Sequence, residues 1–73
     1  MNSVKKWSLN VFDQKKKNEI ESYLLNNAGS LSMITTAHVL SKHIDKDDSI
    51  TLVGDDNTTI EIENNDDKIV FNL

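Results

Sequence analysis

The segment 49–73, SITLVGDDNTTIEIENNDDKIVFNL, alternates apolar and polar residues in three short runs that Asp and Asn residues separate. Alternation with period two is typical of β-strands that bury one face. Asp and Asn favour turns and tolerate the left-handed backbone that tight turns need. The segment therefore predicts a three-stranded antiparallel meander whose central strand lies at about residues 58–63.

Two turns set the pairing of these strands. A turn at residues 55–57 pairs Ile50 with Ile62, and a turn at Asn65–Asp66 pairs Ile62 with Ile69. The same registers also pair Leu52 with Ile60, Ile60 with Phe71, and Glu63 with Lys68. Apolar residues then share one face, which a one-residue slip would turn to water. The predicted inner face is Ile50, Leu52, Ile60, Ile62, Ile69, Phe71 and Leu73, so the last strand is expected to close the core.

Two helices are predicted before the meander. In residues 13–29, Asp13 is a candidate N-cap, Gly29 stands where a C′ glycine would end the helix, and the apolar stripe is Ile20, Tyr23, Leu24 and Ala28. In residues 30–44, Ser30 or Ser32 can cap, and the stripe is Met33, Ala37, Leu40 and Ile44, with Ile34 beside it. The short connection favours an antiparallel helical hairpin.

The opening segment KKWSLNVF alternates Trp7, Leu9 and Val11 with polar residues, which predicts a strand at one edge of the sheet, although Val4, Trp7 and Val11 also fit one helical face. The fold class expected is α+β: a two-helix hairpin packed on an antiparallel β-meander, in the order βααβββ, with the first strand less defined than the others. No linker or repeat divides residues 1–73, so a single small domain is expected.

Size and composition narrow the class of protein. A 73-residue chain without cysteine has a small core and no disulfides. A homodimer is one way to add core. Residues 68–73 form an expected edge strand that only Lys68 guards, and Val53 and Val70 lie on the outer face of the sheet.

No apolar run is long enough for a membrane span and no signal peptide is evident, so a cytoplasmic protein is expected. Lysine without arginine, with abundant Asn, Ile and Asp, suggests an AT-rich genome such as that of a low-GC bacterium or one of its phages.

Charge is unevenly distributed, because residues 1–43 hold six lysines and three acids whereas residues 44–73 hold two lysines and nine acids. In the predicted register, residues 45–48 and the turn near residue 66 meet at one end of the sheet. We call this end the acidic pole, and its predicted members are Asp45, Asp47, Asp48, Glu63, Asp66 and Asp67. Glu61, on the outer face of the central strand, completes the candidate protein-binding set. Turn preference alone can explain these residues, but they can also attract a basic protein partner.

Other chemistry has little support in the sequence. Asp45, Asp47 and Ser49 match the start of a calcium loop, but Ile50 replaces its glycine and Asp56 its final glutamate. His38 and His43 lack the spacing of a metal-binding helical pair, and there is no nucleophile elbow or phosphate-binding glycine loop. We therefore expect no catalytic residue, metal or cofactor, and a non-enzymatic protein that regulates or inhibits a protein partner.

A nucleic-acid-binding regulator is the alternative function. Its candidate residues are in the lysine-rich N-terminal half: Lys5, Lys6, Trp7, Lys15, Lys16 and Lys17. Lysines beside an aromatic residue can bind a single strand. The net charge of −4 and the acidic second half argue against this function, because they repel phosphate.

Overall fold

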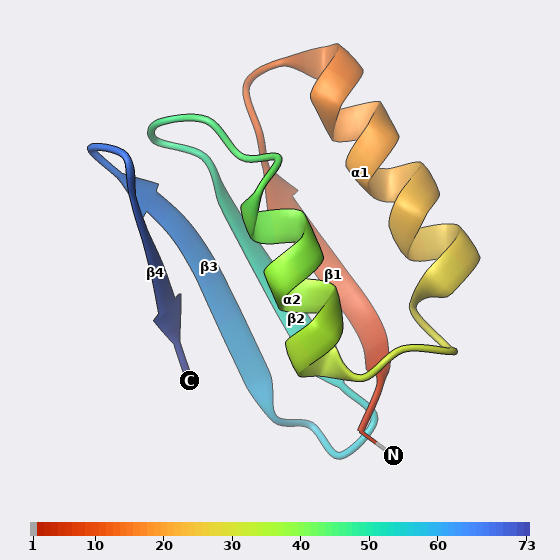
Figure 1. Cartoon of the computed structure of the whole chain (residues 1–73). Coiled ribbons are helices and arrows are strands. Elements are labelled where there is room, and N and C mark those ends of the chain that lie inside the picture. The colour runs from red at the N-terminus through yellow and green to blue at the C-terminus, as the bar shows by residue number, and fades with distance from the viewer. Residues whose placement is uncertain (1) are drawn as a thin grey trace.

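A computed structural model describes residues 2–73 and contains a four-stranded antiparallel sheet with two helices (Figure 1). The elements are β1 (Val4–Asn10), α1 (Gln14–Asn27), α2 (Met33–Ser41), β2 (Ser49–Gly54), β3 (Thr59–Asn65) and β4 (Lys68–Asn72). The strands are arranged in the order β1-β2-β3-β4. The predicted α+β class and the order βααβββ are confirmed, and β1 joins one edge of the meander as expected, where it pairs with β2. No helix in residues 2–73 is long and apolar enough to cross a membrane.

Both helices begin where the sequence predicts. Asp13 caps α1 by accepting the backbone N–H groups of Lys15 and Lys16, and Ser32 caps α2 by accepting the N–H of Thr35. Such caps satisfy amide groups that the first turn of a helix leaves without partners. Gly29 follows the end of α1 but has no positive φ, so α1 ends without the left-handed turn that a C′ glycine usually makes.

The core lies between the two helices and strands β1 to β3. Its buried side chains are Val4, Val11, Ile20, Leu24, Ala28, Met33, Ala37, Leu40, Ile44, Ile50, Leu52, Ile60 and Ile62. The predicted stripes of both helices are therefore confirmed, with Tyr23 half-buried at the margin. Ile34, beside the α2 stripe, is exposed.

The β2–β3 register is the predicted one, with Ile50 opposite Ile62 and Leu52 opposite Ile60. The predicted β3–β4 register is wrong, because Ile62 lies opposite Phe71 and Asn65 lies opposite Lys68. Asp66 and Asp67, with φ of 50° and 67°, form the two-residue turn between these strands. Positive φ at both central residues matches the type I′ turn, which suits the twist of a hairpin.

The expectation that the last strand closes the core is also wrong. Ile69 and Phe71 are each 37% exposed, and Leu73 is 95% exposed. In Figure 1, α2 lies over β2 and β3, α1 lies on the β1 side, and neither helix lies over β4. The inner face of β4 is consequently apolar and only partly covered.

Candidate protein-binding site

The acidic pole is held together by one buried carboxylate. Asp48 is 4% exposed, and its two oxygens accept the backbone N–H of Phe12 at 3.1 Å and of Asp45 at 2.9 Å. These bonds join the loop between β1 and α1 to the turn that precedes β2. Asp48 is therefore a positioning residue and not the exposed contact that the sequence suggested.

The hairpin turn between β3 and β4 meets the same end of the sheet. The N–H of Asp47 donates to the Asn64 carbonyl at 3.1 Å, and the N–H of Asn64 donates to the Asp48 carbonyl at 3.3 Å. The structure thus brings Asp45, Asp47, Asp66 and Asp67 together, as the sequence predicts. All four side chains belong to exposed residues.

Two lysines neutralise part of this charge. Lys16 Nζ lies 2.7 Å from Asp45 Oδ1, which raises the pKa of Lys16, and Lys46 Nζ lies 3.3 Å from Asp66 Oδ1. Within residues 2–73, no lysine forms an ion pair with Asp47 or Asp67. Exposed ion pairs contribute little stability, so Asp45 and Asp66 can exchange their lysines for a partner's cation at low cost.

Phe12 is a functional candidate that the sequence interpretation missed. Its side chain is 98% exposed, and it lines a hollow of about 460 Å³. The other residues around the hollow are Asn10, Asp13, Asp45, Lys46, Asp47 and Asp48. The alternation of the first strand could have predicted this exposure. Because Trp7, Leu9 and Val11 take the positions that face the core, the next residue, Phe12, is expected on the side that faces solvent.

Glu61 and Glu63 lie on the outer face of β3, away from the helices, opposite Thr51 and Ser49 of β2. The Nδ2 of Asn72 donates to both carboxylates at 3.4 Å. A hydrogen bond with the neighbouring Glu63, and its charge, raise the pKa of Glu61. These two side chains extend the negative surface from the pole onto the outer face of the sheet.

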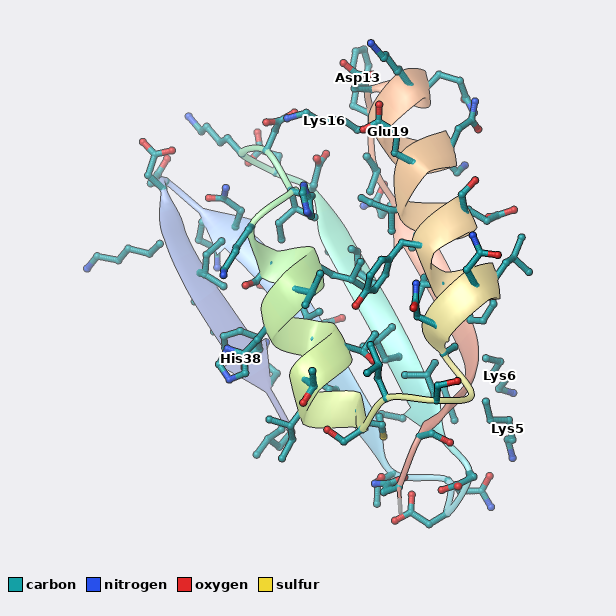
Figure 2. The ribbon with its side chains drawn as sticks, turned by 45° about the vertical axis from the view of Figure 1, so that its right-hand side comes forward. Lys5, Lys6, Asp13, Lys16, Glu19 and His38 are labelled. Atoms are coloured by element: carbon teal, nitrogen blue, oxygen red, sulfur yellow. The ribbon has the colours of Figure 1, made fainter. Side chains whose placement is uncertain are left out.

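The alternative nucleic-acid site is not assembled in the structure. Figure 2 shows Lys5 and Lys6 near one end of the sheet and Lys16 near the other. Lys5 Nζ donates to Asn57 Oδ1 at 2.6 Å, whereas Lys16 bonds Asp45 at the acidic pole. Trp7 is half-buried and packs against the core, so it does not offer a free ring for base stacking.

His38 and His43 are both exposed, and they line different hollows. In the described part of the chain, no three His, Asp or Glu side chains converge in a way that could hold a metal ion.

Searches against protein-family models, curated proteins and solved structures returned no significant match.

Proposed function

We propose that this chain is a non-enzymatic protein that regulates or inhibits a basic protein partner by docking through its acidic pole. The observation that carries the proposal is Phe12, which is 98% exposed at a hollow bordered by Asp13, Asp45 and Asp47. Aromatic side chains are frequent anchors of protein interfaces. Surrounding carboxylates would orient a basic partner and speed its association.

The backbone beneath Phe12 supports this role. Its N–H is fixed by Asp48, and Asp48 is in turn fixed by the N–H of Asp45. A contact surface that is already ordered loses less conformational entropy on binding. Phe12 is therefore presented on a rigid loop, although its side chain has no packing partner of its own.

Turn chemistry is the competing explanation for the carboxylates. Asp47, Asp66 and Asp67 have φ of 70°, 50° and 67°, a left-handed conformation that Asp tolerates. Asn and Gly also suit this conformation. Asp47→Asn and Asp67→Gly therefore remove charge while they preserve both turns.

The test uses a panel of basic proteins and cell extract, captured on the immobilised chain. The variant D47N/D67G and the variant Phe12→Ser should each weaken capture at least tenfold, and added salt should weaken capture by the unmodified chain. The matched control, E21Q/D55N, removes two carboxylates away from the pole and should capture normally. Equal capture by all four proteins would refute the proposed function.

A DNA mobility shift at low and moderate salt tests the alternative function. We expect no shift. A salt-sensitive shift that Lys5→Gln and Lys6→Gln abolish would favour the nucleic-acid-binding regulator instead.

A further inference from the structure

Strand β4 forms an open edge of the sheet. In a two-residue hairpin, the pair that closes the turn, here Asn65 and Lys68, exchanges both of its backbone hydrogen bonds. Alternate residues then point their backbone groups away from β3. The N–H and C=O groups of Ile69 and Phe71 therefore face the edge, where they can bond to another strand.

The same strand has an open apolar face. Ile69, Phe71 and Leu73 are exposed, and Ile34 of α2, 64% exposed, lies across a groove of about 250 Å³. The groove is lined by Ile34, Ala37, His38, Ile60, Phe71 and Leu73. His38 packs against Phe71 with ring centroids 5.2 Å apart, and Figure 2 shows it on the side of α2 that faces β4.

The opposite edge of the sheet is protected. Strand β1 has an irregular register between Val4 and Lys6 and carries exposed Lys5 and Lys6. Bulges and lysines are common devices against edge-to-edge pairing. The register of β4 is regular, and its single charged residue, Lys68, lies at its first position. The two edges thus differ in the features that prevent association.

We propose that β4 is a dimerisation strand, which pairs antiparallel with β4 of a second copy to join the two four-stranded sheets. Pairing centred on Val70 overlaps the whole strand and uses the outward backbone groups. It places Ile69 opposite Phe71 of the second copy on the inner face, and Val70 opposite Val70 on the outer face. Lys68 then lies opposite Asn72.

Charge favours a second copy in this arrangement. Lys68 of the second copy lies directly opposite Asn72, which itself bonds Glu61 and Glu63 of β3, so the cation and the negative pair share the outer face of the joined sheet with one strand between them. No carboxylate lies directly opposite another, because β4 contains no acidic residue. Like charges directly opposite each other destabilise a pair of strands, and the proposed pairing contains none.

The apolar area suits a weak dimer. The exposed fractions of Ile34, Ile69, Phe71 and Leu73 leave on the order of 400 Å² of apolar surface per copy, the size of the largest patch on a typical monomer. With the paired backbones and flanking residues, the interface approaches the ~1,200 Å² at which specific interfaces begin. We therefore expect dissociation in the micromolar range.

Sedimentation equilibrium at several micromolar concentrations tests the dimer. Ile69→Pro removes an outward N–H without removing a bond to β3, and Val70→Lys places two like charges opposite each other on the outer face. Each change should raise the dimer dissociation constant at least tenfold. The control Leu25→Ser alters a side chain that is 70% exposed on α1 and should dimerise normally.

Amide exchange of the unmodified chain gives a readout that does not depend on variants. The amides of Ile69 and Phe71 should exchange more slowly as protein concentration rises, whereas that of Val70, already bonded to β3, should change little. A monomer at every concentration, or a dimer that leaves these two amides unchanged, would overturn the proposal. Capture of a basic partner by a strictly monomeric chain would overturn only the dimer.

Discussion

At the acidic pole, two buried polar side chains supply hydrogen bonds to backbone groups that would otherwise need water. Asp48 accepts two backbone N–H groups, and Asn64 donates its Nδ2 to the Ile44 carbonyl at 2.9 Å while its Oδ1 accepts the N–H of Asp67 at 3.1 Å. Backbone groups that are buried without a partner are costly. These two side chains therefore connect three turns by hydrogen bonds.

Asp48→Ala should destabilise the fold by about 2–3 kcal/mol, because it removes two charge-assisted bonds and leaves two N–H groups unpaired in a partly buried site. Urea denaturation measures this loss. Asp47 is the exposed neighbour of Asp48, and Asp47→Asn should change the free energy of unfolding by less than about 0.5 kcal/mol. Equal effects of the two changes would contradict the structural role of Asp48.

Glu61 should give the stability an inverse dependence on pH. Its pKa is raised in the folded state by Glu63, so the folded state keeps a proton that the unfolded state loses. Stability from this group therefore falls as pH rises from the ordinary carboxyl value through the raised value. Glu61→Gln should be more stable than the unmodified chain at neutral pH, and the difference should vanish in acid.

Thermal unfolding from acid to neutral pH measures the difference in stability between Glu61→Gln and the unmodified chain. Asp56 serves as the control of opposite sign, since hydrogen bonds from Thr58 lower its pKa. The stability that Asp56 contributes is present above its ordinary pKa and is lost as pH falls through the lowered value. Asp56→Asn should therefore be destabilised at neutral pH and approach the unmodified chain in acid.

At the scale of the element, α1 has a charge distribution that opposes its dipole. Lys15, Lys16 and Lys17 lie in its first turns, its first turn contains no acidic residue, and its last turn contains no basic one. Cations are disfavoured at a helix N-terminus. The cap at Asp13 and the Lys16–Asp45 pair act in the opposite sense.

Lys15→Glu should consequently stabilise the protein by about 0.3–1 kcal/mol, since it places an anion at the N-terminal end of α1 and leaves the Lys16–Asp45 pair intact. Thermal unfolding at low salt checks this, and high salt should reduce the gain. The same replacement at Lys42, beyond the end of α2, should give no such gain.

The β3–β4 hairpin shows what sequence patterns can and cannot determine. Moving the turn by one residue, from Asn65–Asp66 to Asp66–Asp67, moves every pair by two residues. Two is the period of a strand, so the inner and outer faces were predicted correctly while the partners were not. In a run of four Asn and Asp residues, each neighbouring pair can form the turn, and composition alone does not choose between them.

At the scale of the whole molecule, the short loops explain which strands the helices cover. The connection at residues 11–13 places α1 beside β1, and residues 28–32 bring α2 back over β2 and β3 (Figure 1). Sequence patterns identify which face of β4 is apolar but not whether a helix reaches it. The gathering of Asp residues at the pole was predictable from turns, whereas the burial of Asp48 and the exposure of Phe12 depend on how those loops pack.

Because the helices cover β3 but not β4, apolar substitutions in these two strands should differ in their cost to stability. Ile62→Ala, at a fully buried position of β3, should cost about 2–5 kcal/mol. Ile69→Ala, at the exposed position of β4, should cost less than about 1 kcal/mol in the monomer. Urea denaturation at low protein concentration measures the free energy of unfolding of both variants. A similar loss of stability in both would show that β4 belongs to the core.

The open inner face of β4 has a consequence for how the molecule comes apart. Removing this strand from β3 breaks one ladder of hydrogen bonds and displaces no fully buried side chain, since every residue of β4 is at least partly exposed. Local openings with few apolar contacts require the least free energy. We therefore expect fraying to begin at this strand, while the two helices and the first three strands remain a closed unit.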